Sequence, residues 1–247
     1  MPTYIAPIRD FNFVMHEVLN FNNHYQKLPN GEAAIDNQAA MLEELAKFAQ
    51  NVLTPLNQVG DQEGCKLENG QVTTPTGFKE AYQQYIESGW PALSQNTEYG
   101  GMGLPTSMGM ALNEIICSAN LAWGMSPGLS DGAMRALQQH ATDELKQAYL
   151  PKLVSGEWTG TMCLTEPHCG TDLGLIKTTA KPQDDGSYLI TGTKIFISAG
   201  DHDLTDNIIH LVLAKLPDAP EGSRGISLFL VPKNLPNAEG EAGAAEG

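Results

Sequence analysis

Residues Glu157–Thr165, EWTGTMCLT, mark the point at which the pattern of this sequence changes. Before them, apolar residues recur at spacings near 3.6, and after them the spacing falls to two. The pattern predicts helices up to about residue 155 and mostly strands from about 158 to 233. Because helices and strands occupy separate parts and do not alternate, we expect an α+β fold of two packed units.

The helical part contains five predicted helices. The clearest is Ile35–Leu56, which we expect to end at Pro55. A second helix takes Thr76 as its N-cap and has Gly89 just past its end. Thr142 caps the fifth helix. Two acidic residues in its first turn interact favourably with the helix dipole. The five segments are 35–56, 76–89, 106–123, 131–140 and 142–156.

The remaining part contains β-branched and apolar runs that predict strands. The opening stretch is one of them. The segment 176–200 reads as a hairpin that turns at Asp184-Asp185-Gly186, and its second limb is expected to remain a strand as far as Ser198. By alternation, Phe196 then shares one face with Ser198. Two further strands cover 207–216 and 225–232.

The composition limits the classes of partner. Acidic residues number 29 and basic residues 14, a formal net charge of −15, so nucleic acid and anionic membranes are poor partners. Backbone N–H groups can still bind an anionic cofactor locally. No apolar run has membrane-spanning length, and the N-terminus does not resemble a signal peptide. Four scattered cysteines favour a reducing cytoplasm over a disulfide framework; they are Cys65, Cys117, Cys163 and Cys169.

Residues Met162–Asp172, MCLTEPHCGTD, concentrate the side chains that carry chemistry. Cys163, Glu166, His168 and Cys169 are all possible metal ligands. Structural zinc sites usually show C-x₂₋₄-C or H-x₃₋₅-H pairs, whereas Cys163 and Cys169 are six positions apart and no second pair lies nearby. We therefore expect no metal here.

Two other interpretations of this stretch are open. A catalytic Cys–His pair is disfavoured, because such residues normally meet through the fold, and Cys163 sits within an apolar strand. The turn at Gly170-Thr171-Asp172 instead exposes N–H groups and hydroxyls, as an anion-binding loop would. On spacing alone, a plain β-turn with capping hydroxyls is favoured over the binding loop.

The stretch MCLTEPHCGTD resembles the flavin-binding signature of the acyl-CoA dehydrogenases, a T-E-P followed by G-S-D or G-T-D. Other motifs follow in the family order: TEYGGMGLP, LKQAYLPKLVSGEWTGTMCLTEP and the G-x-K-x-[WF]-I-[ST] pattern in YLITGTKIFISAG. The start, YIAPIRDFNFVMHEV, resembles an extension in a long branch that includes 3-methylmercaptopropionyl-CoA dehydrogenases. The resemblance covers about Tyr4–Lys233.

This resemblance implies an N-terminal helical domain followed by a truncated antiparallel β-barrel domain. We expect an extension at 1–34, the helical domain at 35–157, the partial barrel at 158–235 and a flexible Gly/Ala/Glu-rich tail at 236–247. It also implies FAD as cofactor, an acyl-CoA substrate, an electron-transfer flavoprotein as electron acceptor and a homo-oligomer. The residues carried over for FAD are Met162, Leu164, Thr165, Gly170, Thr171, Phe196, Ile197 and Ser198.

Substrate contacts follow from the same resemblance. Thr171 is placed near the CoA thioester arm, and the stretch AWGMSPGLSDG matches the region that lines the acyl pocket. Its candidates are Met125, Ser126 and Leu129, for which helix packing is the alternative. His168 and Cys169 replace the small residues that many relatives carry.

The family removes the α-proton of the acyl thioester with a glutamate of a C-terminal helical domain, which this resemblance does not reach. We therefore name no catalytic residue and expect the chain to be a fragment, inactive alone. The glutamates rejected as substitutes are Glu98, Glu114, Glu157 and Glu166, and the last is expected to hold the loop. The alternatives are a non-catalytic binding or scaffold paralogue and an acyl-CoA oxidase.

Overall fold

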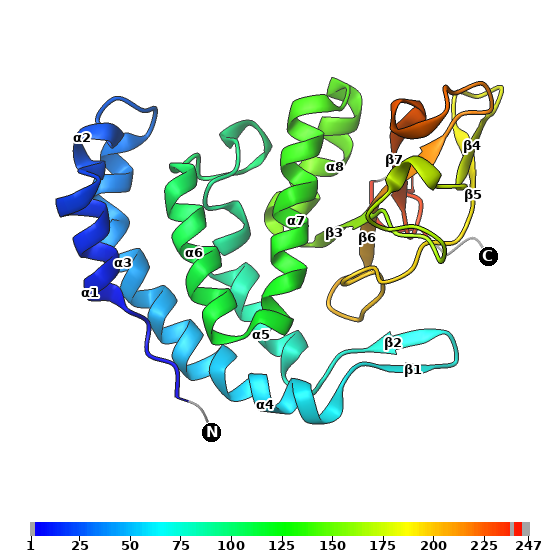
Figure 1. The fold of residues 1–247 in the computed structure, drawn as a ribbon. Coiled ribbons are helices and arrows are strands. Elements are labelled where there is room, and N and C mark those ends of the chain that lie inside the picture. Colours follow the sequence, from blue (N-terminus) through cyan, green and yellow to red (C-terminus); the bar gives the residue numbers. More distant parts are fainter. Residues whose placement is uncertain (1–2, 238–239, 244–247) are drawn as a thin grey trace.

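The computed structural model describes residues 3–237 and 240–243. Its helices gather on one side, and a mixed sheet lies at the other side beyond α7 and α8 (Figure 1). The helices are α1 Ile8–Asn12, α2 Phe21–Tyr25, α3 Gly31–Phe48, α4 Thr54–Glu63, α5 Phe78–Glu87, α6 Thr106–Ala119, α7 Leu121–His140 and α8 Asp143–Ser155. The strands are β1 Lys66–Glu68, β2 Gln71–Thr73, β3 Trp158–Cys163, β4 Thr179–Pro182, β5 Tyr188–Thr191, β6 Asn207–Lys215 and β7 Ile226–Pro232.

The first predicted helix does not end at Pro55. α3 passes through a π-helical turn, Ala49–Leu53, directly into α4, which continues to Glu63. Pro55 is the second residue of α4, in the first turn, where its missing N–H is tolerated. The Thr54 hydroxyl donates a hydrogen bond of 2.9 Å to the Ala49 carbonyl, which further satisfies the widened turn.

Asn120 divides the region in which the sequence predicted helices 106–123 and 131–140. Its backbone is extended, its Oδ1 accepts from the Trp123 N–H at 3.0 Å, and its Nδ2 donates to the Leu53 carbonyl at 3.1 Å. α6 therefore ends at Ala119, directly before Asn120 and not at residue 123 as predicted. α7 runs unbroken for 20 residues, from Leu121 to His140. A short polar side chain that caps the next helix is favoured at such a boundary.

The prediction of an all-helical first part was wrong between α4 and α5. The hairpin β1–β2 stands there, closed by Asn69 and Gly70, both at positive φ. Asn-Gly is the usual signal of a two-residue hairpin turn. The Asp203 carboxylate accepts from the Thr74 N–H and hydroxyl at 3.0 and 2.7 Å, which ties the hairpin to the β part. Gly77, and not Thr76, occupies the N-cap of α5.

The expected antiparallel barrel is not observed, because the described strands form an open, mixed sheet. β6 is the long central strand. β3 and the first residue of β4 pair with it in parallel, and β7 pairs with it in the antiparallel sense. The pairing of β3 with β6 joins strands 44 or more residues apart, which no local pattern reports. The strands predicted at 157–165, 207–216 and 225–232 are confirmed.

The β4–β5 hairpin confirms the predicted turn at Asp184-Asp185-Gly186, with Gly186 at positive φ. Its second limb ends at Thr191, earlier than predicted. Phe196 has a φ of 56° and Ala199 a φ of 52°, and these left-handed conformations exclude a regular strand. The alternation that placed Phe196 and Ser198 on one face therefore does not apply.

A shared core joins the sheet to α7 and α8. Met134, Leu150 and Leu153 of the helices pack in one buried cluster with Trp158 and Ile209 of β3 and β6. No described helix is long and apolar enough to cross a membrane. The expected tail 236–247 lies partly outside the described residues; where it is described, Glu241 pairs with Lys152.

We predict that Asn120→Ala lowers the free energy of unfolding by about 2–3 kcal/mol, since it removes a helix cap and leaves the buried Leu53 carbonyl without its donor. Urea unfolding followed by far-UV circular dichroism measures this. Asn37→Ala is the control, because that exposed side chain bonds only within its own helix. Equal losses for both variants would contradict the role of Asn120.

Candidate functional site

The end of β3 leads into a tight turn that presents the candidate residues. Glu166 and Cys169 form an isolated antiparallel bridge: the Glu166 N–H donates to the Cys169 carbonyl at 2.8 Å, and the Cys169 N–H donates back at 3.1 Å. The turn therefore reverses the chain directly after Leu164 and Thr165. Gly170 follows, and a Cβ there would lie 3.3 Å from the Thr165 methyl.

The Glu166 carboxylate anchors this turn from inside. It is buried, and its Oε1 accepts from the Thr178 N–H, the Thr178 hydroxyl and Lys194 Nζ at 3.0, 2.5 and 2.9 Å. Its Oε2 accepts from the Lys177 N–H at 2.7 Å. Burial by itself raises the pKa of Glu166, but these hydrogen bonds outweigh it and lower the pKa to about 2. The expectation that Glu166 holds the loop is confirmed.

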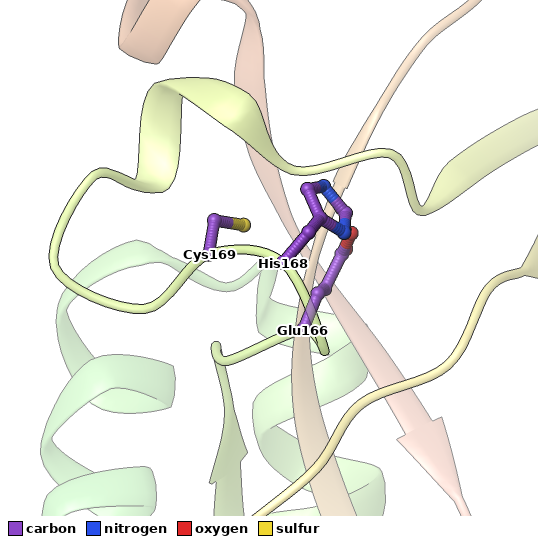
Figure 2. Close-up of side chains that lie close together, drawn as sticks. All are labelled: Glu166, His168 and Cys169. Carbon is purple, nitrogen blue, oxygen red and sulfur yellow. The ribbon is translucent and has the colours of Figure 1, made fainter.

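Glu166, His168 and Cys169 lie close together on this turn (Figure 2). One ligand atom from each falls within 4.8 Å of the others. The Glu166 oxygens already accept four hydrogen bonds, and His168 Nε2 lies 2.9 Å from the Leu175 carbonyl. A metal ion would have to displace these bonds, so the absence of a metal remains our prediction.

A second segment, distant in sequence, lies beside the turn. The Ile195 N–H donates to the Thr165 carbonyl at 2.9 Å, and Lys194 Nζ donates to the Leu164 carbonyl at 3.1 Å. These bonds place Phe196 next to the end of β3. The Phe196 side chain is 89% exposed, and its residue has a positive φ. Non-glycine residues held in a sparsely populated backbone conformation cluster at ligand sites, which makes Phe196 a candidate contact.

Polar groups at the end of β3 remain available. Among the residues that the structure describes, no acceptor is found for the Leu164 and Thr165 N–H groups. All eight residues carried over for the cofactor are at or near the surface. Met162, Leu164, Thr165 and Ile197 are partly exposed, and Gly170, Thr171, Phe196 and Ser198 are exposed.

The other face of β3 is closed and holds a polar pair that the sequence did not reveal. Thr161 Oγ1 lies 2.7 Å from His210 Nδ1, and Cys163 Sγ lies 3.9 Å from the same nitrogen. Burial lowers the pKa of His210 and raises the pKa of the Cys163 thiol, so both groups are neutral at pH 7. Cys163 is therefore not poised as a nucleophile.

A cavity of about 610 Å³ lies along α6 and α7. The predicted acyl-pocket residues Met125, Ser126 and Leu129 do not line it, although they belong to the same stretch of α7. Ser126 Oγ is buried without a partner in the described part of the chain. The members of that stretch that do line the cavity are Pro127, Gly128, Ser130 and Asp131.

Ser130 connects this cavity to the turn. It lines the cavity, and its Oγ accepts from the Gly160 N–H of β3 at 3.0 Å. A Cβ on Gly160 would lie 2.5 Å from the Ala133 Cβ, so only glycine lets β3 approach α7 this closely. Gly160, which bonds the cavity-lining Ser130, is thus two residues before Met162 on β3.

The four rejected glutamates occupy different surroundings. Glu98 and Glu157 are exposed and accept from Gln147 and Lys152. Glu166 is buried and accepts the four hydrogen bonds described above. Glu114, exposed on α6, is the one among these four whose side chain lines the cavity.

Known proteins are similar to this chain over most of its length. A relative from Ruegeria pomeroyi, 3-methylmercaptopropionyl-CoA dehydrogenase, is 48% identical over 239 residues, which are 97% of this chain and 41% of the relative. The structure of butyryl-CoA dehydrogenase from Megasphaera elsdenii has a TM-score of 0.66 and 26% identity over 79% of this chain and 48% of its own. The FAD complex of PigA has a TM-score of 0.61 and 25% identity over 79% of this chain and 47% of its own.

This chain spans less than half the length of these proteins. The family model described as acyl-CoA dehydrogenase, N-terminal domain, matches residues 35–157. The model described as acyl-CoA dehydrogenase, middle domain, matches residues 161–244. The chain therefore belongs to the acyl-CoA dehydrogenase family.

Proposed function

We propose that this chain supplies the flavin-binding turn and part of the acyl-binding surface of an FAD-dependent acyl-CoA dehydrogenase. The hydrogen bond between the Ile195 N–H and the Thr165 carbonyl carries this proposal. It brings together, from residues 30 apart, the two segments that resemble the flavin-binding motifs of the family. The first segment supplies the N–H groups of Leu164 and Thr165, and the second supplies the aromatic ring of Phe196.

The residues present fit a flavin. The N–H groups of Leu164 and Thr165 and the Thr165 hydroxyl match the acceptors on the polar edge of the ring. When bound, FAD supplies the acceptor for the hydride that leaves the acyl chain. We assign the ring contacts to Met162, Leu164, Thr165, Phe196, Ile197 and Ser198, and the pyrophosphate side to Gly170 and Thr171.

The cavity along α6 and α7 is proposed to receive the acyl chain. It is the cavity whose wall, through Ser130, bonds to the strand that leads into the flavin-binding turn. Thr171 is assigned to the thioester arm, and Met125, Ser126 and Leu129 remain assigned to the acyl-binding region. We assign no base, because Glu166 is buried with four hydrogen bonds and its low pKa makes it a weak proton acceptor.

The wider role follows from the resemblance. We propose a cytoplasmic homo-oligomer that passes its electrons to an electron-transfer flavoprotein. An oxidase would pass them to oxygen, so release of hydrogen peroxide separates these two, and a scaffold protein would retain no flavin.

The test uses the protein in its complete native form. The purified protein should show flavin absorbance, and an acyl-CoA thioester added without oxygen should bleach it. Absence of flavin after reconstitution with FAD, or flavin that no acyl-CoA reduces, would overturn the proposal.

We predict that Thr165→Ala weakens FAD retention or shifts the flavin spectrum more than Cys163→Ala does. A hydroxyl bonded to the ring edge contributes on the order of 1–3 kcal/mol, whereas the Cys163 side chain is buried away from it. Flavin occupancy and absorbance spectra of the two variants measure the difference. Identical occupancy and spectra would contradict the assignment of Thr165.

We predict that Glu166→Gln lowers the free energy of unfolding by roughly 3 kcal/mol at pH 7, because it removes a buried charge that Lys194 compensates. The folded pKa of about 2 lies below the unfolded value near 4.3. The advantage of glutamate is therefore complete above about pH 4.3 and disappears as the pH falls toward 2.

Urea unfolding of wild type and variant across this pH range provides the measurement. Glu157→Gln is the matched control, because its ion pair with Lys152 lies at the surface and contributes about 1 kcal/mol or less. A pH-independent difference for Glu166→Gln would show that its charge does not stabilise the turn.

A further inference from the structure

One side of the cavity along α6 and α7 carries an organised polar network. Arg135 Nε donates to Asp131 Oδ2 at 2.7 Å, and Gln95 Nε2 donates to Asp131 Oδ1 at 2.8 Å. Gln138 Nε2 in turn donates to Gln95 Oε1 at 2.9 Å. Asp131 and Arg135 line the cavity, whereas Gln95 stands behind them and is only 3% exposed.

The buried glutamine distinguishes this network from an ordinary ion pair on a helix surface. A pair at positions i and i+4 needs no outside support and contributes little to stability. Here Gln95, 36 residues away in sequence, holds one Asp131 oxygen from the protein interior. The carboxylate is thus fixed in one orientation at the cavity wall, as a recognition group would be.

Both cavity-facing groups keep capacity for a ligand. Each Asp131 oxygen has a second lone pair, and the terminal Nη groups of Arg135 have no acceptor within the described part of the chain. The side chains of Asp131 and Arg135 are 41% and 45% exposed, so both groups are open to water. A ligand that enters must replace that water or leave the groups without partners.

The lining also includes the polar residues Ser94, Thr106, Asn113, Glu114 and Ser130, and its apolar part is suited to a hydrocarbon chain. Leu112, Met134 and Leu153 line the same cavity together with Tyr85 and Trp90. A straight alkyl chain would match these residues, but it would remove water from the free lone pairs of Asp131 and the Nη groups of Arg135 and give them no new partner. A carboxylate on the chain would be repelled by the negative charge of Asp131, and an ammonium group would be repelled by the positive charge of Arg135. A hydroxyl group can donate to Asp131 and accept from Arg135 at once.

We propose that Asp131 and Arg135 are specificity-determining residues that select acyl chains bearing an uncharged hydroxyl group. This inference rests on the proposed function, since it assigns the cavity to the acyl chain. The preference arises because a site built to bond a hydroxyl discriminates against the analogue that lacks it.

The experiment measures binding to the complete, FAD-loaded protein by isothermal titration calorimetry. The probes are S-(ω-hydroxyalkyl)-CoA thioethers and S-alkyl-CoA thioethers of matched chain length, which have no carbonyl and cannot be oxidised. At the best length, we expect the hydroxylated probe to bind about tenfold more tightly. Asp131→Leu should abolish this preference without weakening the binding of the alkyl probe.

Arg135→Met leaves the Gln95–Asp131 bond intact and carries the same expectation should Asp131→Leu fail to fold. Glu44→Leu is the control, because it breaks an exposed ion pair with Lys47 on α3, away from the cavity, and should keep the preference. Equal affinity of wild type for both probe series overturns the inference. A preference that survives in the cavity variants overturns it as well.

The two proposals fail in different ways. If straight-chain acyl-CoAs bleach the flavin but the hydroxyl group brings no advantage, the acyl-CoA dehydrogenase function stands and the specificity inference is wrong. If no acyl-CoA bleaches the flavin and neither probe series binds, both are wrong.

Discussion

The buried carboxylate of Glu166 is the interaction on which the arrangement of this site depends. Charge in the protein interior is costly unless it is paired, and here Lys194 and the Thr178 and Lys177 donors satisfy it. The same lysine also bonds the Leu164 carbonyl, so one charged pair clamps three segments. Without it, the turn after β3 and the segment around Phe196 would lose the bonds through Lys194 and keep, among the hydrogen bonds of the described residues, only the bond from the Ile195 N–H to the Thr165 carbonyl.

The contact between α7 and β3 is the second constraint. Because Gly160 has no side chain, the strand approaches the helix closely enough for the Ser130 hydroxyl to accept its N–H. One face of α7 then lines the cavity while β3 continues to the turn at Glu166. The helical unit that lines the cavity and the sheet unit that carries the turn are thereby held against each other.

Local patterns predicted much of the chain. The change of period at Trp158, the Thr142 cap of α8 and the hairpin at Asp184-Asp185-Gly186 are confirmed, since each depends on residues near in sequence. The Asn69-Gly70 hairpin was equally visible in the sequence but was overlooked within a helical region. The motif resemblance also identified the family and predicted that Glu166 holds the loop.

The sequence by itself therefore determined the division into a helical and a β part, the family and the position of the candidate turn. The tertiary structure decided what lies opposite each element: the parallel pairing of β3 with β6, the left-handed backbone of Phe196 beside Thr165, and the cavity wall at Asp131. Such features arise from contacts between residues far apart in the chain. Periodicity and capping depend only on residues near in sequence. The contacts between distant residues contribute to the free energy of the fold, but no local sequence pattern predicts them.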